Sequence, residues 1–480
     1  EAEQTDRLAK ELAVPATDDG AKYNWVSKGS GPRVPATVRA IWDGKSFLQE
    51  APEGETVGVV TDVTSFYPES GGQLFDSGKI TTADGTVFVV SNVQKFGAYI
   101  LHIGALGSGA VKVGGKVDLE VDYERRALCA ANHTSTHLLN WALRKVLAGS
   151  TIDQRGSIVG PDKLRFDFSY GKPMRTEEIA EVQTLVRELI RAGCPVQRQE
   201  VALAAAKQVK SLRAVFGEVY PDPVRVVSVG PVPHTIDELL AAPEREDWMR
   251  LSVEFCGGTH MDNTAEADTF TIISEEGTAK GVRRLTAYTR EAAKAAQDAA
   301  TEFEKRVETA SGLADMAALD QEISAMRMDV DGIVMDYVRK DAIKKRIDAL
   351  KDRVLAAEKE TVRLKTEAAL KWVEGLALEP TPRHLVEVVD VDGDTKAVDA
   401  AMRALTARAP ELPVLLLSRS AGGDRVSCLA VVPPARGADA REWVNAALEH
   451  CGGKGGGKAD RAQGAAKEAA GFDKAVQGAR

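Results

Sequence analysis

The chain has 480 residues, of which 44% are hydrophobic and 28% are charged, a balance that excludes a wholly disordered protein and suggests roughly three domains of about 150 residues each. Its 62 basic and 71 acidic side chains give a formal net charge of −9, which excludes a uniformly basic nucleic-acid-binding surface but allows a local basic groove. No uncharged apolar run of about 18 residues occurs, so no membrane span is predicted.

The N-terminal sequence shows no signal peptide and lacks an initiator Met, so we expect a processed chain or a piece of a longer one. We interpret residues 1–35 as a linker. The five cysteines include no Cys-x-x-Cys pair, which indicates a reducing compartment and thiols that are buried or metal-bound.

Residues 36–122 are predicted to form a β-rich, barrel-like subdomain. Short apolar alternations, separated by Gly, Asp and Asn, predict strands at 56–60, 87–90, 111–113 and 117–121. From Glu124 the apolar residues recur every three or four positions, which predicts a helix that ends at Gly149.

Residues 123–290 are interpreted as a mixed α+β core. The same patterns predict strands at 164–168, 224–229 and 270–273, and helices at 176–192 and 203–212. Together with the β-rich subdomain, this region is large enough to bury its own hydrophobic core.

Residues 291–378 are predicted to form a helical coiled-coil arm. A heptad seam with alternating steps of four and three residues runs through Ile343, Ile347, Leu350, Val354, Ala357, Thr361 and Leu364. Gly312 and Gly332 interrupt the helical pattern, so we favour a helical hairpin over one long rod. The pattern leaves open whether this arm is a spacer or a dimerisation element.

Residues 379–480 are interpreted as a small α/β module that begins at Pro380-Thr-Pro. Its pattern predicts strands at 385–389, 414–417 and 427–432, and helices at 396–408 and 438–450. The predicted fold class of the whole chain is therefore α+β, with a barrel-like subdomain, a mixed core, a helical arm and a small α/β module.

Two pairs of residues form a candidate metal site. His133 and His137 lie four residues apart in a predicted helix, so their imidazoles project from one face. Cys256 and His260 flank two glycines, which favour a tight loop with both side chains turned inward. Three imidazoles and one thiolate are a donor set that suits tetrahedral Zn²⁺. Cys129, one helical turn before His133, could face the same site.

Two alternatives bear on this site. A metalloprotease helix would read His-Glu-x-x-His, but position 134 is Thr and no carboxylate lies between the two histidines, so we set that class aside. A closed structural zinc site stays open, because four protein ligands fill a tetrahedral shell while catalysis needs an open or weakly held position.

A second candidate segment lies at residues 64–73, between two predicted strands. Gly71 and Gly72 allow the backbone to approach a ligand, Gln73 can present an amide, and Thr64 offers a hydroxyl. The simpler interpretation is an ordinary turn.

The C-terminal module contains a glycine-rich segment at 451–464. It is not a phosphate-binding P-loop, since Lys458 is followed by Ala459 instead of Ser or Thr. From Cys451 to the end the chain has six basic and three acidic side chains, a modest positive patch suited to RNA phosphates. The candidates for this contact are Lys454, Lys458 and Arg461, and a flexible solvated loop is the alternative.

In combination these motifs resemble the editing domain of alanyl-tRNA synthetase and its free-standing relatives. The resemblance rests on Thr-x-Phe-Tyr-Pro-x-x-Gly-Gly-Gln at 64–73, His-x-x-x-His at 133–137, Arg-Phe-Asp-Phe at 165–168 and Phe-Cys-Gly-Gly-Thr-His at 255–260. The tail Gly-Lys-Gly-Gly-Gly-Lys is similar to the C-Ala domain of the same family. The resemblance covers essentially the whole chain.

The segment 214–228 looks most like the eukaryotic cytosolic form, which implies a cytoplasmic protein. We find no resemblance to the class II catalytic domain, so we expect a C-terminal half that edits and binds tRNA(Ala) but does not aminoacylate. ATP and Mg²⁺ would belong to the missing catalytic domain. A homodimer through the C-terminal region would also fit the family.

The resemblance implies zinc-dependent hydrolysis of mischarged Ser-tRNA(Ala) and Gly-tRNA(Ala). An alanine pocket cannot reject the smaller glycine by size, and serine adds only a hydroxyl, so a second sieve is needed. With no carboxylate base evident, a water held by the metal or an RNA hydroxyl would have to take that role. The implied roles are zinc binding for His133, His137, Cys256 and His260, catalysis for Cys256, His260 and Gln73, and substrate binding for Thr64, Gly71, Gly72, Gln73 and Arg165. An inactive tRNA-binding or dimerisation fragment with a structural zinc is the alternative.

Overall fold

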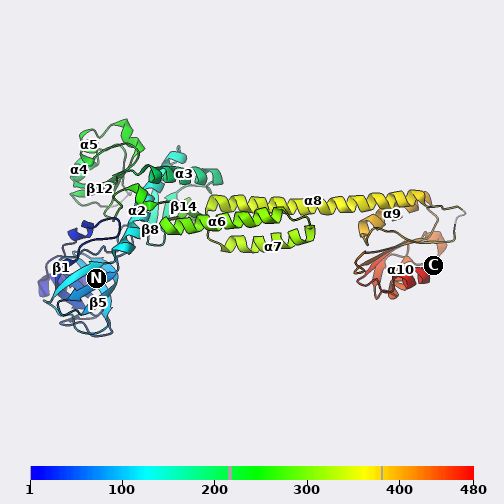
Figure 1. Ribbon diagram of the computed structural model, residues 1–480, viewed down its shortest axis with the longest axis horizontal. Coiled ribbons are helices and arrows are strands. Elements are labelled where there is room, and N and C mark those ends of the chain that lie inside the picture. The colour runs from blue at the N-terminus through cyan, green and yellow to red at the C-terminus, as the bar shows by residue number, and fades with distance from the viewer. Residues whose placement is uncertain (1, 215–218, 380–381) are drawn as a thin grey trace. The chain divides into compact units, whose positions relative to one another are not determined.

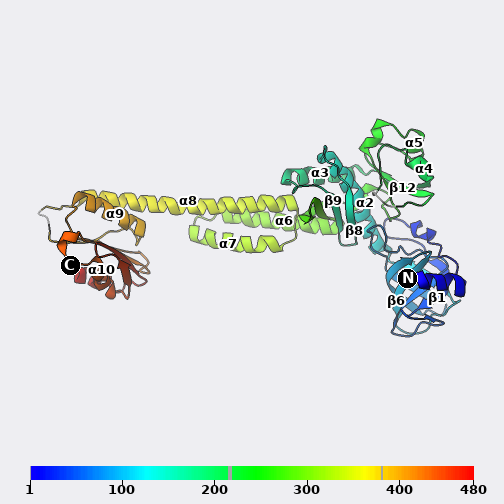
Figure 2. The same ribbon diagram turned by 180° about the vertical axis from the view of Figure 1, so that it is seen from behind.

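The computed structural model describes residues 2–214, 219–379 and 382–480, and Figures 1 and 2 show it from opposite sides. These residues form two compact units, Glu1–Thr309 with Met326–Arg346, and Ala310–Ala325 with Ile347–Arg480. Two sequence-based expectations fall outside the described residues, namely part of the cytosolic-type segment (215–218) and the start of the expected C-terminal boundary (380–381).

The first part of the chain forms a closed β-barrel. Six strands pair in the order β1-β3-β6-β5-β4-β7, and β7 closes the barrel by pairing with residues 34–37 of β1, while β2 pairs with Ile41 and Trp42 at the other end of β1. The strands are β1 (Val34–Trp42), β2 (Phe47–Leu48), β3 (Thr56–Thr61), β4 (Gly78–Thr82), β5 (Val87–Phe96), β6 (Tyr99–Leu106) and β7 (Lys116–Val121). Alternate side chains such as Val59, Phe88 and Leu119 fill the interior and are fully buried. The predicted barrel-like subdomain is confirmed.

One predicted strand of this region is wrong. Residues 111–113 form only an isolated bridge between Glu50 and Lys112. Val111 does enter the barrel core, but Gly114 has a φ of +84° and turns the chain directly afterwards. The apolar pattern therefore predicted the burial of Val111 correctly, although the segment is too short to form a strand of the sheet.

The stretch before the barrel, which we expected as a linker, packs against it. It contains α1 (Ala2–Asp6), a π-helical turn (Arg7–Glu11) and a 3₁₀ turn (Gly20–Tyr23). Leu8 and Val14 are buried against the barrel residue Tyr99, whose hydroxyl donates a 2.9 Å hydrogen bond to the Val14 carbonyl.

The long helix α2 (Tyr123–Val146) packs against a four-stranded sheet of order β14-β15-β9-β8 and against α3 (Thr176–Ala192). The strands are β8 (Gln154–Val159), β9 (Leu164–Ser169), β14 (Phe270–Ala279) and β15 (Val282–Thr289). The Asp122 side chain caps α2 by accepting from the Arg125 N–H at 2.9 Å. Because α2 is covered on most sides, polar residues such as His133 and His137 are buried with its apolar ones.

A second sheet of order β10-β12-β13-β11 carries the loop with Cys256 and His260. Its elements are β10 (Gln197–Val201), α4 (Leu203–Ala206), β11 (Leu212–Arg213), β12 (Val224–Val229), α5 (Ile236–Ala241), a 3₁₀ turn (Glu246–Arg250), β13 (Ser252–Phe255) and a second 3₁₀ turn (Thr264–Ala267). The helix predicted at 203–212 is thus shorter, because the chain turns after Ala206 so that Leu212 and Arg213 can pair with β13.

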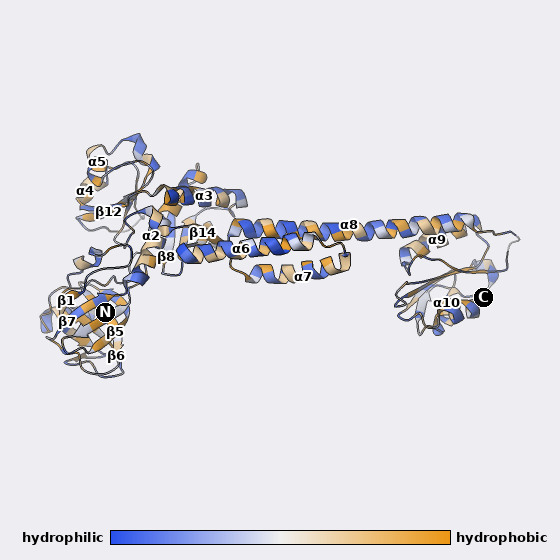
Figure 3. Cartoon of the chain, viewed as in Figure 1, coloured by the Kyte–Doolittle hydropathy of each residue, from blue (hydrophilic) through white to orange (hydrophobic). Residues whose placement is uncertain are grey.

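Three helices follow, α6 (Arg290–Ser311), α7 (Met316–Gly332) and α8 (Tyr337–Gly375). Gly312 comes directly after α6, and Gly332 is the last residue of α7, so both glycines lie at helix ends. Figure 3 shows hydrophobic and hydrophilic residues alternating along α8. Of the predicted heptad seam, Ile343, Ile347, Leu350 and Val354 are buried, whereas Leu364 is 52% exposed. The seam is therefore covered only in its first half.

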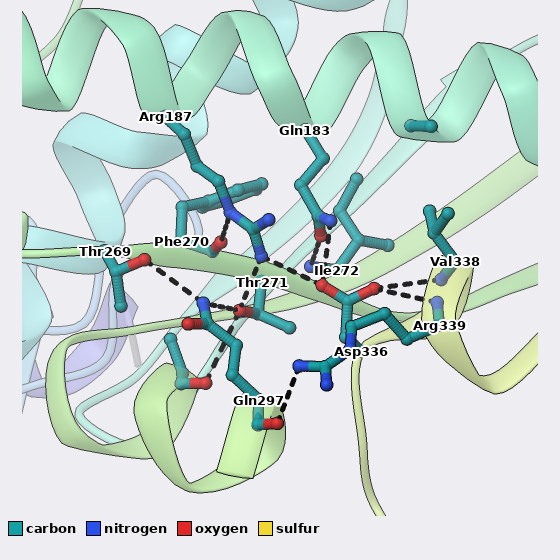
Figure 4. Close-up of polar contacts among 12 residues, drawn as sticks. Gln183, Arg187, Thr269, Phe270, Thr271, Ile272, Gln297, Asp336, Val338 and Arg339 are labelled. Carbon is teal, nitrogen blue, oxygen red and sulfur yellow. Dashed lines mark hydrogen bonds and ion pairs between the residues drawn. The ribbon is translucent and has the colours of Figure 1, made fainter. Parts of the chain in front are cut away.

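The first turn of α8 is fixed by a buried set of polar groups, the Asp336 cluster (Asp336, Gln183, Arg187 and the backbone N–H groups of Val338 and Arg339; Figure 4). Gln183 and Arg187 of α3 donate to Asp336 Oδ2 at 2.8 and 2.9 Å. Val338 and Arg339 donate their N–H groups to Oδ1, both at 3.1 Å. The carboxylate therefore caps α8 and also joins it to α3.

The C-terminal module is a five-stranded sheet of order β16-β17-β18-β20-β19, in which β16 and β17 are parallel and the other pairs antiparallel. Its elements are β16 (Leu385–Val388), α9 (Thr395–Arg408), β17 (Val414–Arg419), β18 (Val426–Val431), a 3₁₀ turn (Pro434–Arg436), α10 (Ala440–Glu449), β19 (Lys454–Gly457), β20 (Arg461–Ala466) and α11 (Phe472–Ala479). Separate hydrophobic clusters lie on its two faces. The predicted α/β module is confirmed.

The glycine-rich tail forms the hairpin β19–β20 and is not a flexible loop. A Cβ on Gly455 would lie 2.3 Å from Val444 Cγ1, and one on Gly464 would lie 2.5 Å from Leu448 Cδ1. These two glycines let α10 pack closely on the sheet, which is a structural reason for their presence.

Candidate metal centre

Four side chains from two distant segments converge at one buried point. His133 and His137 lie on α2, and Cys256 and His260 lie in the loop after β13; their ligand atoms all lie within 4.8 Å of one another. Cys256 Sγ is 3.3 Å from both His133 Nε2 and His260 Nε2. The structure thus brings together the four residues that the sequence pattern paired.

The geometry of this group fits a tetrahedral metal ion. Ligands at Zn–N and Zn–S distances of about 2.0–2.3 Å stand roughly 3.3–3.6 Å apart in a tetrahedron, close to the two 3.3 Å separations at Cys256 Sγ. The three histidines are 1–5% exposed, whereas Cys256 is only partly buried. A set of three imidazoles and one sulfur is one that Zn²⁺ favours.

On the side away from the cluster, two of the three imidazoles contact neutral polar side chains. His133 Nδ1 lies 2.7 Å from the amide oxygen of Gln73, and His260 Nδ1 lies 3.1 Å from the hydroxyl of Thr134. Such outer contacts orient a metal-binding imidazole and fix which ring nitrogen carries the proton. Gln73, expected to contact substrate, is fully buried and lies directly against the cluster.

The third imidazole faces a carboxylate that the sequence analysis missed. His137 Nδ1 lies 3.7 Å from Glu254 Oε2 and is buried without a hydrogen-bond partner among the described residues. Glu254 Oε1 accepts from Asn140 Nδ2 at 3.0 Å and from Ser252 Oγ at 3.1 Å. Glu254 lies on β13 two residues before Cys256, which follows the strand directly, and the two-residue spacing of a strand could have indicated that both side chains lie on one face.

The loop with Cys256 is held by its carbonyl groups. Arg225 of β12 donates to the carbonyls of Cys256 and Gly258, each at 2.9 Å, and the Tyr23 hydroxyl donates to that of Gly257 at 2.8 Å. The Arg225 guanidinium also stacks on the Tyr23 ring at 4.2 Å from its centroid. Sequence reasoning missed both residues, because neither belongs to a motif.

Electrostatics favour the thiolate in this cluster. Burial alone would raise the pKa of Cys256, but the charges of His133 and His260 hold it well below its usual range. Burial lowers the pKa of His137, yet Glu254 and Cys256 outweigh it and raise the pKa to about 9. Burial holds the pKa of His260 well below its usual range. A metal ion would thus meet a deprotonated sulfur and displace a proton from His137.

Cys129 does not join this group. Its thiol is buried, and burial raises its pKa to about 12, so it behaves as a small apolar side chain. Among the described residues, the group with metal-binding geometry consists of His133, His137, Cys256 and His260.

The structure places Thr64 in the barrel and not in the cluster. Its hydroxyl lies 2.7 Å from His102 Nε2 and accepts from the Phe66 N–H at 3.0 Å, and the residue is fully buried. His102 Nδ1 lies 2.9 Å from the Val59 carbonyl, and burial lowers the His102 pKa to about 4. The Thr64 hydroxyl therefore has protein partners already.

Gly71, Gly72 and Arg165 also lie outside the cluster. Gly72 has a φ of +85°, and a Cβ there would lie 2.3 Å from Ser157 Oγ, so this glycine lets the loop lie on β8. Arg165 lies on β9 with its Nε 3.6 Å from Asp167 Oδ1. No hydrogen bond links these residues to the four ligands in the described part of the chain.

The three basic residues of the C-terminal module differ in their surroundings. Lys454 and Lys458 are exposed and, within the described residues, form no ion pair. Arg461, also exposed, forms an ion pair with Asp399 of α9. The hairpin thus presents two uncompensated charges and one that is neutralised.

Four family models match separate parts of the chain. They are "tRNA synthetases class II (A)" at residues 1–125, "Threonyl and Alanyl tRNA synthetase second additional domain" at 224–286, "Alanine--tRNA ligase domain" at 293–357 and "DHHA1 domain" at 382–480. The sequence analysis finds no resemblance to the class II catalytic domain, whereas a class II synthetase model matches residues 1–125, whose described part forms the barrel and its flanking segments.

Curated relatives match almost the whole chain. The cytoplasmic alanine–tRNA ligases of Dictyostelium discoideum and Bombyx mori are each 36% identical, over 96% and 98% of this chain and 49% and 50% of theirs. The alanine–tRNA ligase of Candida albicans is 35% identical over 97% of this chain and 47% of its own length. The chain thus spans about half the length of these relatives.

Among solved structures, the C-Ala domain of Aquifex aeolicus alanyl-tRNA synthetase matches 20% of this chain and 83% of that chain, with 26% identity and a TM-score of 0.17. None of the helices described is long and apolar enough to cross a membrane.

Proposed function

We propose a function for this chain from the premise that it belongs to the alanyl-tRNA synthetase family, with that family's editing and C-Ala domains. The function is hydrolysis of the ester bond in Ser-tRNA(Ala) and Gly-tRNA(Ala) at the cluster of His133, His137, Cys256 and His260. The observation that carries the proposal is the convergence of these four side chains from α2 and the loop after β13.

The chemical need for such a reaction follows from size. A synthetic site shaped for alanine admits glycine, which is smaller, and discriminates weakly against serine, which adds one hydroxyl. Because binding alone cannot provide enough discrimination, a separate site has to remove the wrong amino acid after transfer. A buried polar centre in a chain that also carries an RNA-binding module is suited to that task.

Of the four residues in the cluster, Cys256 is the most exposed. The three histidines are almost fully buried, while Cys256 is partly exposed, so an ester would approach from the side of Cys256. A Zn²⁺ ion bound there would supply Lewis acidity toward the ester or its attacking water. The chain itself holds the Cys256 loop in place through Arg225 and Tyr23.

The C-terminal module would bind the tRNA backbone. Lys454 and Lys458 on or next to β19 are exposed cations without ion-pair partners in the described part of the chain, and Arg461 lies at the start of β20. Phosphate contacts from such residues are independent of sequence and weaken with salt. A homodimer through this region remains part of the proposal, supported only by the family.

A second function is favoured by one observation. Four protein donors already complete a tetrahedral shell, which is typical of a structural zinc. In that case the chain binds tRNA and metal without hydrolysing the ester. The hydrolase and the tRNA-binding fragment would both contain zinc, and only the hydrolase would cleave the ester of Ser-tRNA(Ala).

A deacylation assay on Ser-tRNA(Ala) separates them. We expect the wild-type chain to hydrolyse the ester, a chelator to stop the reaction, and Cys256→Ala to lower the rate by about 100-fold or more, since a metal ligand is lost. Cys451→Ala, a buried cysteine of the C-terminal module, serves as the control and should keep the wild-type rate. Hydrolysis that persists in Cys256→Ala and in chelator would contradict the assigned centre.

A further inference from the structure

We propose that Gln73 is a positioning residue for the metal centre, through which the barrel loop fixes the tautomer and orientation of the His133 ring. The family resemblance, by contrast, implies that Gln73 contacts the substrate and takes part in catalysis. The inference rests on the metal centre of the proposed function, and it makes the β-barrel a determinant of metal affinity.

The orientation of the Gln73 amide is fixed by Thr259. The Thr259 backbone N–H donates to Gln73 Oε1 at 2.9 Å, and Gln73 Nε2 donates to Thr259 Oγ1 at 2.9 Å. A flipped amide would place its NH₂ group against the Thr259 N–H, two donors face to face. The oxygen therefore has to point toward the cluster.

This orientation decides the tautomer of His133. Gln73 Oε1 lies 2.7 Å from His133 Nδ1, and an amide oxygen can only accept. In the neutral ring Nδ1 must therefore carry the proton, so Nε2 is the nitrogen free to bind a metal ion, and it lies 3.3 Å from Cys256 Sγ. Nε2 is thus the ligand atom without any rearrangement of the ring.

The Gln73 amide is enclosed by protein atoms, which leaves little space for a substrate group beside it. Gln73 is fully buried, and a Cβ on Gly258 would lie 2.1 Å from His133 Cε1 and 3.0 Å from Gln73 Oε1. The glycine of the ligand loop is therefore in close contact with the Gln73–His133 pair. A substrate group would have to displace a protein partner to reach the amide oxygen.

The loop that carries Gln73 is rigidly attached on both sides. The Val159 N–H of β8 donates to the Gly72 carbonyl at 2.7 Å, and the Leu74 N–H donates to the Val159 carbonyl at 2.9 Å. A second contact, made by Arg126, connects the same loop to α2.

That second contact is a buried ion pair. Arg126, two helical turns before His133, bonds to Asp76 and donates to the Ser65 carbonyl at 2.5 Å. Arg126 and Asp76 are both almost fully buried. Helix α2 and the loop 64–76 therefore meet at Arg126 as well as at His133, and the loop presents Gln73 as a fixed acceptor.

The test compares zinc affinity in three variants of the full chain. Gln73→Met keeps the side-chain volume but loses the acceptor, and we expect about 10- to 100-fold weaker zinc binding in competition with a chelator. Gln73→Glu retains an acceptor oxygen for both His133 Nδ1 and the Thr259 N–H, so it should recover most of the affinity. Gln94→Met, on the solvent side of barrel strand β5, is the matched control and should bind zinc as wild type does.

Two further readouts distinguish positioning from substrate contact. Cobalt substitution should show an altered ligand-field spectrum in Gln73→Met but not in Gln94→Met, because the His133 ring is free to turn. Hydrolysis of Ser-tRNA(Ala) by Gln73→Met should recover when zinc is raised to saturation. Wild-type zinc affinity in Gln73→Met would overturn the proposal, whatever the rate.

The outcome is separable from the fate of the proposed function. A wild-type chain that takes up zinc but does not hydrolyse the ester overturns the hydrolase, while the affinities still decide the role of Gln73. A wild-type chain that takes up no zinc overturns both.

Discussion

The metal centre and the Asp336 cluster are both buried groups of polar side chains in the same unit, but their atoms are satisfied in different ways. In the Asp336 cluster, each carboxylate oxygen accepts two hydrogen bonds from protein donors (Figure 4). In the metal centre, His133 Nε2 and His260 Nε2 converge on Cys256 Sγ, each at 3.3 Å. The Nδ1 atoms of His133 and His260 contact protein side chains, while their Nε2 atoms and Cys256 Sγ face one common point.

This difference separates a structural cluster from a ligand site. A buried polar group is stabilised when its partners lie within the protein, and a fully paired network has no further need of a ligand. In the metal centre two imidazole nitrogens and a sulfur face one point, and a cation bound between them would satisfy all three atoms at once. The direction in which donor atoms point, more than the burial of polar residues, therefore identifies the functional centre.

The largest effect is expected where the Asp336 cluster is broken. Asp336→Ala removes a buried carboxylate that accepts from Gln183, from the half-buried Arg187 guanidinium and from two backbone N–H groups, and each buried donor left without its acceptor costs about 1–3 kcal/mol. Chemical denaturation should show that fall in the free energy of unfolding, while zinc content of the folded protein stays unchanged.

The control for this variant is an exposed pair of the same unit. Asp329→Ala removes an ion-pair partner of Arg306. The Asp329 side chain is 49% exposed, so the free energy of unfolding should fall by less than about 1 kcal/mol. A similar loss in both variants would show that burial does not set the contribution of the Asp336 cluster.

A smaller effect is expected at the outer carboxylate of the metal centre. Glu254→Gln keeps the side-chain shape but removes the charge that faces His137 Nδ1, and we expect about tenfold weaker zinc binding. Glu200→Gln, an exposed carboxylate on β10, is the control. Equal affinities in the two variants would leave Glu254 without influence on the metal.

The smallest effect concerns paired and unpaired charges in the C-terminal module. If Lys458 contacts a tRNA phosphate, Lys458→Ala should weaken binding and lower the slope of log affinity against log salt by about 0.7–0.9. Arg461→Ala should change the slope less, because Asp399 already neutralises that guanidinium. A larger effect for Arg461 would mean that its ion pair opens when RNA binds.

The spacing of residues along the sequence was enough to predict several helices and the two pairs of candidate metal-binding residues. Three- and four-residue periodicity predicted α2 and gave α3 its observed bounds of Thr176–Ala192, because helix geometry fixes which residues share a face. The same rule placed His133 and His137 side by side. Tight loops between Cys256 and His260 also follow from their two glycines.

Tertiary structure alone decided what these pairs meet. Glu254, Arg225 and Tyr23 surround the centre without belonging to any motif, and Gln73 contacts His133 instead of standing free for a substrate. Helix α4 was cut short because Leu212 and Arg213 pair with a strand distant in sequence. Backbone geometry acts over a few residues, so the local sequence pattern can predict it. The packing of α2 against β13 and the barrel loop depends on complementary surfaces, and no short segment of sequence contains both surfaces.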